Sequence, residues 1–383
     1  MDRRIFSLCR MLTLLSAFWA FEVGAVAYSL PAATFSACTG SWNAATHTCG
    51  SRVVFQPGDT LTVSTALTIR ANAGFELQGN NSLGVGGATV SLVSTYGDIA
   101  VGTGSRVNGS LTSGSGTVEL TGAHVEGNVE GDGIGRITDS SIAGDTTFKN
   151  GLTALRSIFS GAVTVTNGTA NFTDSRVVGE VEVRNVLTAQ GSEFGSTVTA
   201  TNGSISLSGG SVAGRVTTNC CTVTTNQTNL EQGITAHSGI SITGGVIAGD
   251  FVMTTNNNIS LTGVVMTSGS IDAFNIRVSD SDLGSAENPV SLTANGNRLD
   301  ILNGSTVYGS VVVDNHWGKL TIDSPSAVYG TCLAESTPDT NNNVNGECGA
   351  GAPPAIDHFR LSFTTPQFSC EPIPVTIRAC VDA

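Results

Sequence analysis

An asparagine recurs along this chain at a nearly constant spacing, and that spacing constrains the fold more than any other feature. The Asn column consists of Asn150, Asn167, Asn185, Asn202, Asn219, Asn256, Asn275, Asn295 and Asn315. The first five lie 17 or 18 residues apart and the last four 19 or 20. The gap of 37 between Asn219 and Asn256 equals two periods, with His237 near the missing position. A constant period of this length is typical of stacked structural repeats.

A second column, the corner column, keeps the same period. It consists of Gly122, Asp139, Ser157, Asp174, Gly191, Gly209, Asn226, Gly244, Gly263 and Asp280. These residue types tolerate left-handed or tight-turn backbone. We therefore expect a bend at each member of both columns, and we expect each Asn amide to bond the Asn one coil away.

Between the bends, short runs alternate apolar residues with Thr or Ser, which is the pattern of a half-buried strand. In the coil from Val163 to Gly179, the expected inward residues are Val163, Val165, Phe172 and Val177. The pattern predicts an all-β, single-stranded parallel β-solenoid with three short strands and about 17–20 residues per coil, and we expect it to be right-handed. Twelve or 13 such coils would form a rod of roughly 60 Å. A sandwich of hairpins is the alternative, but it would place turn signals every 8–12 residues without a fixed long period.

The two ends depart from the repeat. Residues 1–27 have the features of a cleaved signal peptide, with early arginines, a short apolar core and Ala25-Val26-Ala27 as the cleavage site. We expect 28–99 to be an N-terminal cap with the first coils and 100–330 to be the regular β-solenoid. Residues 331–355 have the Asn, Gly and Pro content of a linker, and 356–383 read as two strands that open a truncated C-terminal β domain.

Eight cysteines follow the signal segment, an even number that suits an oxidising compartment. Their spacing favours disulfides between neighbours in sequence: Cys38 with Cys49, Cys332 with Cys348, and Cys370 with Cys380. Cys220 and Cys221 are adjacent and read either as two thiols or as an eight-membered disulfide ring. Paired C-x-x-C units are missing, which argues against a zinc site.

Composition and motifs argue against several function classes. A net charge of −13 disfavours nucleic acid as a partner, because an acidic surface repels phosphate. The sequence contains no P-loop, no G-x-S-x-G and no H-E-x-x-H motif. We therefore assign no catalytic residue, no cofactor and no metal.

Two sets of charged residues are candidates for a catalytic site. Asp139 and Asp174 share the corner column two coils apart, with Arg156 and Ser157 between them, so they read either as a carboxylate pair on a groove or as residues that hold bends. Glu180, Glu182 and Arg184 project from one strand face, but the neighbouring coil has Ala162, Thr164 and Thr166 at the same places. The five histidines (His47, His124, His237, His316 and His358) share no column. We favour the structural interpretation for all of them.

The ends also carry a family resemblance. Tyr-Ser-Leu-Pro-Ala at 28–32, Cys-Thr-Gly at 38–40, Thr-Cys-Gly at 48–50 and Pro-Gly-Asp-Thr-Leu-Thr-Val at 57–63 resemble the mature start of the MSHA biogenesis protein MshQ family. Ile-Asp-His-Phe-Arg-Leu at 356–361, Ser-Cys at 369–370 and 375–383 look like the opening of that family's large C-terminal domain. About 80 residues carry the resemblance, and the central coils share only the architecture.

The resemblance implies a role with the mannose-sensitive haemagglutinin, a type IV pilus of Gram-negative bacteria. We expect a non-enzymatic exported protein that acts as a scaffold or adhesion module in the periplasm, at the outer membrane or on the cell surface. Its expected partners are pilus or cell-surface components and surface glycans, with no nucleic acid and at most a peripheral membrane contact. The alternatives are a polysaccharide-active lyase or hydrolase on the same scaffold, and a free-standing adhesin or polymerising rod.

Overall fold

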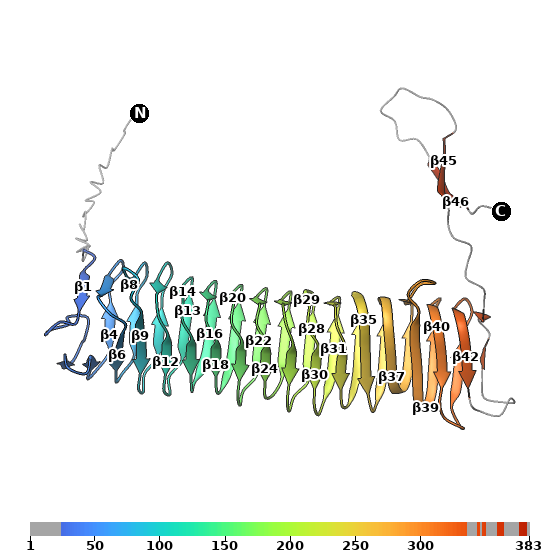
Figure 1. Ribbon diagram of the computed structural model, residues 1–383, viewed down its shortest axis with the longest axis horizontal. Helices are drawn as coiled ribbons and strands as arrows, with labels where there is room; N and C mark the ends of the chain where they lie inside the picture. The colour runs from blue at the N-terminus through green and yellow to red at the C-terminus, as the bar shows by residue number, and fades with distance from the viewer. Residues whose placement is uncertain (1–23, 335–342, 345–346, 350–357, 364–374, 381–383) are drawn as a thin grey trace, which may run out of the picture.

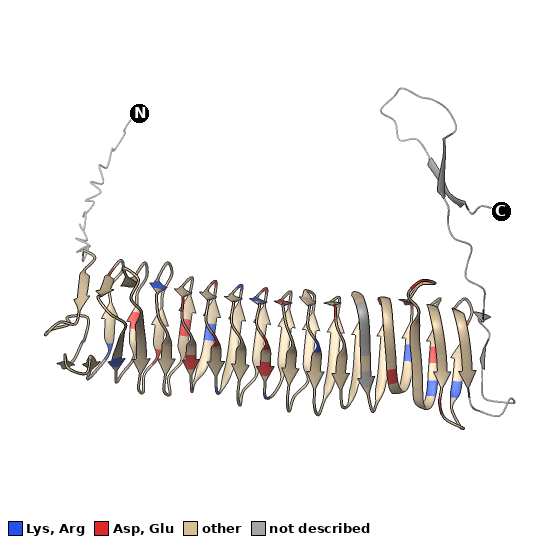
Figure 2. Cartoon of the chain, viewed as in Figure 1, with Lys and Arg blue, Asp and Glu red and all other residues tan. Residues whose placement is uncertain are grey.

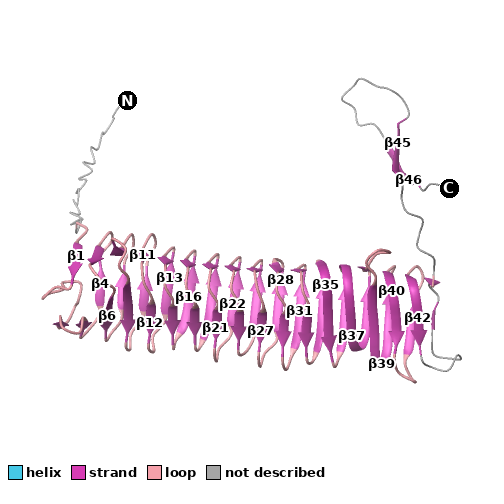
Figure 3. Ribbon diagram, viewed as in Figure 1, coloured by secondary structure: helices cyan, strands magenta, loops and turns pink. Residues whose placement is uncertain are grey.

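The computed structural model describes residues 24–334, 343–344, 347–349, 358–363 and 375–380. These residues contain no helix, and their strands stack into one parallel β-solenoid of about 16 turns with about 18 residues per coil (Figures 1 and 3). The predicted fold class is therefore confirmed. The stack has more coils than the 12 or 13 expected, because β4 (Val53–Phe55), β7 (Phe75–Leu77) and β10 (Ile99–Val101) already pair in series within the N-terminal region.

Each regular coil contributes one strand to each of three faces, named here by one coil. Face A contains β21 (Val163–Val165), face B contains β22 (Ala170–Thr173), and face C contains β23 (Arg176–Val177). Each strand pairs in parallel with its equivalents one coil before and one coil after, as β21 does with β18 (Thr146–Phe148) and β24 (Val181–Val183). Backbone hydrogen bonds between coils therefore run along the rod.

The strands follow this three-face order along the chain. The other face A strands are β3 (Thr48–Cys49), β6 (Leu67–Ala71), β9 (Val90–Ser94), β12 (Leu111–Ser113), β15 (Val129–Gly131), β27 (Val198–Ala200), β30 (Val216–Thr218) and β33 (Ile234–Ala236). The other face B strands are β13 (Val118–Thr121), β16 (Ile134–Thr138), β19 (Gly151–Leu155), β25 (Leu187–Gln190), β28 (Ile205–Ser208), β31 (Thr222–Asn226), β34 (Gly239–Thr243), β36 (Asn258–Thr262), β41 (Lys319–Ile322) and β43 (Asn343–Val344). The other face C strands are β1 (Ala27–Leu30), β5 (Thr60–Val63), β8 (Ser82–Val85), β11 (Arg106–Val107), β14 (His124–Val125), β17 (Ser141–Ile142), β20 (Ile158–Phe159), β26 (Glu193–Phe194), β29 (Ser211–Val212), β32 (Asn229–Leu230), β38 (Asp282–Leu283) and β44 (Glu347–Cys348).

Towards the C-terminal end the strands run through the bends and cover two or three faces each. The strands concerned are β35 (Val246–Thr255), β37 (Val265–Ser279), β39 (Val290–Leu302), β40 (Thr306–Val313) and β42 (Ala327–Ala334). Two antiparallel pairs complete the inventory: β2 (Trp42–Asn43) with β3, and β45 (His358–Phe363) with β46 (Val375–Cys380).

The core fills the inside of the coil as the alternation predicts. Val163, Val165, Phe172 and Val177 are all buried, and the Phe172 ring lies edge-on to Phe159 and Phe194 with centroids 6.1 and 5.4 Å away. Edge-to-face contact of this kind adds to the area that each ring buries. Like residues stack on like residues along the rod, so one continuous apolar core runs through it.

The corner column is real, but two of its predicted members are displaced by one residue. Left-handed backbone, with φ between 46° and 75°, occurs at Gly104, Gly122, Asp139, Arg156, Asp174, Gly191, Gly209, Gln227, Gly244, Gly263, Asp280 and Asn303. Arg156 and Gln227 thus occupy the places that we assigned to Ser157 and Asn226. The prediction favoured Ser and Asn because they are turn formers, whereas coil stacking forces whichever residue stands at the corner into this conformation.

Ser157 belongs to a third, buried column that follows the corner. Its hydroxyl accepts a hydrogen bond from the Ser140 backbone N–H (3.3 Å) and donates one to the Leu155 carbonyl (2.8 Å). The same N–H to hydroxyl contact repeats at Ser105, Ser140, Ser175, Ser192, Ser281, Ser305 and Ser326. These hydroxyls satisfy backbone groups that the sharp corner removes from the strand ladders.

The Asn column is less uniform than its period suggests. Asn150, Asn167, Asn185 and Asn202 occupy equivalent positions one coil apart. Asn219 and Asn256 precede that position by one residue and stand with His237. Asn275 begins the face B part of β37, while Asn295 and Asn315 lie at or just after the ends of face A strand segments.

Stacking of one Asn amide on another is not the general rule in the Asn column. Asn150 Nδ2 donates to the Asp132 carbonyl at 2.8 Å, and Asn185 Nδ2 donates to the Asn167 carbonyl. The amide therefore holds the bend by bonding the backbone of the preceding coil. Asn275, whose Nδ2 donates to Asn258 Oδ1 at 2.8 Å, makes an amide–amide contact from a different position.

Three disulfides lie in the described part of the chain. Cys38 is bonded to Cys49 in the N-terminal cap, Cys332 to Cys348 near the last coil, and Cys220 to Cys221 as a vicinal pair with a Cα–Cα distance of 3.7 Å. Cys220 follows β30 at the coil position that Asn202 occupies one turn earlier. The predicted Cys370–Cys380 bond lies outside the described residues.

The segment boundaries differ from the sequence estimate at both ends. β1 already includes Ala27, the last residue of the predicted signal segment, and pairs it with Thr60. The expected linker 331–355 contains the end of β42 together with β43 and β44, which pair with the preceding coil. The solenoid therefore continues to at least residue 348. No helix among the described residues is long and apolar enough to cross a membrane.

Candidate functional site

Charged side chains are sparse on this rod and gather in a few places, as the separate blue and red segments of Figure 2 show. Seven consecutive face B strands, from β19 to β36, contain no charged residue. Before that stretch lie Glu119 and Arg136, and after it lie Arg277, Arg298 and Asp300. On face B, charged side chains therefore stand only before and after this stretch.

Asp139 and Asp174 stand at corners of the solenoid two coils apart. Arg156 stands between them and donates from Nε and Nη2 to the two oxygens of Asp139, both at 2.7 Å. These hydrogen bonds and the guanidinium charge lower the pKa of the Asp139 carboxyl. A general acid needs the opposite shift, because it must hold its proton near neutral pH. The Asp139–Arg156 bridge therefore ties one coil to the next.

Face C holds a cluster that the sequence did not reveal. His124 Nδ1 is hydrogen-bonded to Ser141 Oγ (2.6 Å), and His124 Nε2 lies 3.0 Å from Glu126 Oε1. Arg106, one coil earlier, forms an ion pair with the same Glu126 oxygen. Stacking makes the cluster, since Arg106, His124 and Ser141 are direct neighbours in the strand register.

The chain Ser141–His124–Glu126 contains the residue types of a hydrolytic triad. Acyl transfer also needs free N–H donors for the oxyanion beside the nucleophile. Here the Ser141 N–H donates to the Ala123 carbonyl and the Ala143 N–H donates to the Val125 carbonyl. The strand ladder therefore uses the donors next to Ser141, and the cluster is best described as a polar bridge across three coils. The bond from His124, with the charges of His124 and Arg106, lowers the pKa of Glu126.

The remaining charged residues weighed in the sequence stay apart. Glu182 pairs in register with Thr164 and Thr199, so its neighbours on face A are hydroxyls, as expected. His47 lies in the N-terminal cap beside Trp42, His316 lies against Trp317, and His237 lines a hollow with Asn219 and Asn256. Each of these histidines stands in its own part of the rod.

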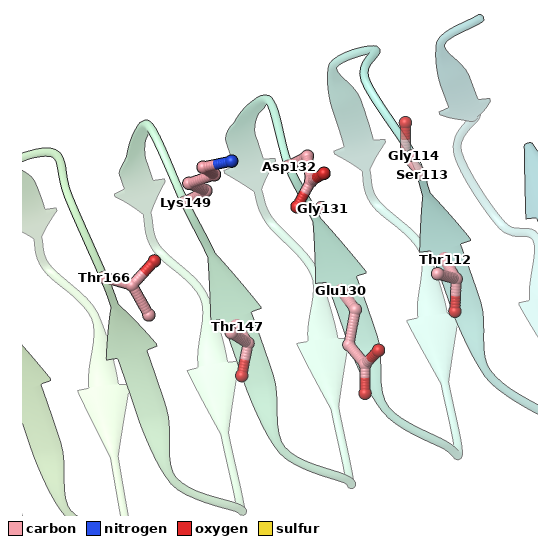
Figure 4. A pocket seen from close by; sticks show the side chains of 9 residues that line it. All are labelled: Thr112, Ser113, Gly114, Glu130, Gly131, Asp132, Thr147, Lys149 and Thr166. Carbon is pink, nitrogen blue, oxygen red and sulfur yellow. The ribbon is translucent and has the colours of Figure 1, made fainter. Parts of the chain in front are cut away.

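A hollow of about 500 Å³ lies on face A over β12, β15, β18 and the residue after β21. Figure 4 shows the residues that line this hollow. The Lys149 amine projects towards Asp132, whereas the Glu130 carboxylate points away from Lys149. The lining residues are Thr112, Ser113, Gly114, Glu130, Gly131, Asp132, Thr147, Lys149 and Thr166. Its charged groups are all exposed: Glu130 lies on β15, whereas Asp132 and Lys149 follow β15 and β18.

A second hollow, of about 350 Å³, lies on face B over β36, β37 and β39. Asp300 lies at its floor, between the core residues Leu299 and Ile301, and is only 3% exposed. Its Oδ2 is 2.5 Å from Arg298 Nε, whereas its Oδ1 is buried without a hydrogen-bond partner. The bond and the charge of Asp300 raise the pKa of the Arg298 guanidinium.

Register brings two further groups to this hollow. Arg277 of β37 is the direct neighbour of Asp300, and Asn275 is the neighbour of Arg298. Lys319 of β41 flanks Arg298 on the other side. Sequence reasoning missed this cluster. One signal was present, an aspartate between two core residues with an arginine two positions before it. The pairing with Arg277 depends on a register shift between Ala273 and Asn275 that the sequence does not display.

Metal-ligating side chains do not gather in the described part of the chain, where no three His, Cys, Asp or Glu residues stand close enough to hold an ion. Comparison of the chain with protein-family models, with curated proteins and with solved structures gave no match. The site residues are therefore interpreted from their own geometry.

Proposed function

We propose that this chain is a non-enzymatic, exported β-solenoid that acts as a scaffold or adhesion module in the biogenesis of a type IV, MSHA-like pilus or agglutinin. The observation that supports this most is the unbroken parallel pairing from β4 to β42, which makes a stiff rod. At about 4.8 Å per coil, 16 coils extend over about 75 Å. A rod of that length suits a spacer that holds a module away from its attachment point.

The proposed partners are pilus or cell-surface components and surface glycans. The proposed address is the periplasm, the outer membrane or the cell surface, with at most a peripheral membrane contact. Disulfides persist mainly in oxidising compartments, and the bonds Cys38–Cys49 and Cys332–Cys348 fit such an address. The resemblance of the two chain ends to the MshQ family supplies the link to the pilus.

Deletion of the gene, followed by electron microscopy of surface pili and by a haemagglutination assay, tests the proposal. We expect fewer pili or weaker agglutination, restored by the intact gene. A matched complementation uses a gene from which residues 163–197, close to two coils of the regular repeat, have been removed in frame. A spacer should then work less well although the chain still folds. Unchanged piliation and agglutination after deletion would contradict the proposal.

A polysaccharide-active enzyme is the second candidate, and the contact between His124 and Glu126 on face C favours it, because both side chains can transfer a proton. The test incubates the purified protein with acidic and neutral polysaccharides and measures new reducing ends and unsaturated products. Release of such products by the native chain, and its loss in His124→Ala, would establish this function in place of the first.

A further inference from the structure

The floor of the face B hollow is a buried carboxylate with one oxygen unused. Asp300 is 3% exposed, Arg298 Nε bonds its Oδ2 at 2.5 Å, and its Oδ1 has no partner. An unpaired buried acceptor is costly, so native structures usually provide a partner for each one. Asp300 lines a hollow of about 350 Å³, within the range of small-ligand sites, and a turn of its carboxyl would bring Oδ1 to the surface of that hollow. The missing donor can therefore come from a ligand.

The rim of the hollow is cationic. Arg277 and Arg298 line the hollow with the single carboxylate of Asp300, and Lys319 flanks Arg298, so the local formal charge is 3 − 1 = +2 on a chain whose net charge is −13. In the part of the chain that the structure describes, neither Arg277 nor Lys319 forms an ion pair. The Arg298 guanidinium is held by Asp300 through Nε, which leaves its outer N–H groups free to bind a planar anion.

The hollow continues along the rod into an uncharged trough. A neighbouring hollow of about 270 Å³ over β31, β34 and β36 shares Asn258 and Ser260 with it. The neighbouring hollow is lined by Thr222, Thr224, Ser241 and backbone, and its accessible surface is mainly apolar. Together the two hollows cross five consecutive strands of one face, with the charges at one end only.

We propose that this trough binds an acidic glycan whose charged sugars are spaced by uncharged ones. A carboxylate of the glycan binds Arg277 and the outer N–H groups of Arg298. A ring hydroxyl of the same sugar donates to Asp300 Oδ1. Neighbouring uncharged sugars lie over Asn258, Ser260 and the trough hydroxyls.

The combination of groups favours a sugar acid over other anions. A simple anion such as phosphate or sulfate, when fully ionised, offers no hydrogen-bond donor to Asp300. A polyanionic peptide carries a charge at every residue, whereas the cations occupy only one end of the trough. A uronate offers a carboxylate and hydroxyl donors within one ring, and its uncharged neighbours suit the rest of the trough. This inference stands apart from the pilus role, because sugar binding can be measured whether or not piliation depends on the gene.

Calorimetric titration of the full chain, in 20 mM and 150 mM salt, tests the proposal. The probe is a hyaluronan hexasaccharide, in which glucuronate alternates with N-acetylglucosamine. Two matched probes are the same hexasaccharide with its carboxyls methyl-esterified and a hexaglutamate peptide. We expect the acid form to bind at least tenfold more tightly than the ester or the peptide, since only it offers both the spaced carboxylates and the hydroxyls.

Three variants locate the site. Arg277→Gln removes an exposed cation without an ion pair, so the fold should be kept while hyaluronan affinity falls at least tenfold. Arg298→Gln should weaken binding further, and a thermal melt shows whether the now unpaired Asp300 has also destabilised the coil. Arg184→Gln removes an equally exposed cation from the end of a face A strand and should leave the affinity unchanged.

Four results would overturn the proposal. They are no binding of hyaluronan in either salt, equal binding of the methyl ester, equal binding of hexaglutamate, and equal losses in Arg277→Gln and Arg184→Gln. Equal peptide binding would assign the hollow to acidic proteins in general, and equal losses would show that only the overall charge matters. Each outcome can be read without reference to the deletion phenotype.

Discussion

The regular coils in the middle of the rod and the longer coils at its C-terminal end both stack in parallel, but their strands meet the bends differently. In the middle, three short strands per coil are separated by corners with left-handed backbone and a buried Ser hydroxyl, as at Arg156 and Ser157. At the C-terminal end the strands run through the bends, as in the 15-residue β37 and the 13-residue β39. Register then shifts, as it does between Ala273 and Asn275.

The difference shows which coils of a repeat can bring new combinations of side chains together. In coils of fixed length each outward residue lies beside its equivalent one coil away, and on faces A and B of the middle coils most of these positions are Thr or Ser. A lengthened coil breaks that equivalence and can place Arg277 beside Asp300 without disturbing the core at Ile276 and Leu299. The variants below either break the rules of the middle coils or measure how strongly they hold.

Truncation of a ring in the middle core should have the largest effect. Phe172→Ala removes the central ring of the Phe159, Phe172 and Phe194 contacts, in coils that cannot collapse around the space because their strand register is fixed on both sides. The free energy of unfolding should fall by about 3–5 kcal/mol. Urea denaturation followed by circular dichroism measures it. Thr188→Ala, on the outer surface of the next strand, is the control, and a fall below ~1 kcal/mol for Phe172→Ala would contradict the packing described.

The buried serine column should come next. Ser175→Ala leaves the buried Ser157 N–H without the hydroxyl that accepts its hydrogen bond at 3.2 Å. A buried donor without a partner costs about 1–3 kcal/mol. Hydrogen exchange at the Ser157 amide and urea denaturation report the change together. Ser206→Ala, an exposed serine on face B, provides the matched control, and equal stability of the two variants would remove the structural role given to this column.

The corner column predicts a smaller penalty. Gly209 has φ +69, and a Cβ added there would meet nothing closer than 3.6 Å, so the cost of Gly209→Ala is one of backbone conformation alone. That cost is about 1 kcal/mol. Gly209→Asn should cost less, because Asn tolerates left-handed backbone better than Ala. The opposite order of the two variants in a thermal melt would show that the corner does not select residues in this way.

Acid should weaken the Asp139–Arg156 contact, with the smallest effect of the four. The lowered folded-state pKa of Asp139 means that the folded chain holds its proton less tightly than the unfolded chain does. The contact therefore stabilises the fold above the ordinary carboxyl pKa of 3.8, and this contribution is lost as pH falls through the lowered value. Asp139→Asn should flatten this part of the stability profile between pH 5 and 2. Both groups are exposed, so the change should be small, and an unchanged profile would show that the bridge contributes nothing.

The sequence predicts the period well because every coil must repeat it, and the fold class follows from the period. The predicted position of the corner was wrong by one residue in the two coils where the corner residue is not a typical turn former, at Arg156 and Gln227. The buried serine column escaped notice because Ser175 and Ser192 read as surface residues until the stack supplies their backbone donors. The Arg298–Asp300 site depends on a register that only the folded coils establish.

The direction of the hydrogen bonds has a mechanical consequence. The hydrogen bonds between coils lie along the rod, parallel to a pulling force applied at its two ends. Such a force separates the coils one after another and does not shear all of the bonds at once. An end coil would peel away first, and each detached coil of about 18 residues would release about 60 Å of chain. Extension of the rod would thus proceed in equal steps, and each step would require work to detach one coil.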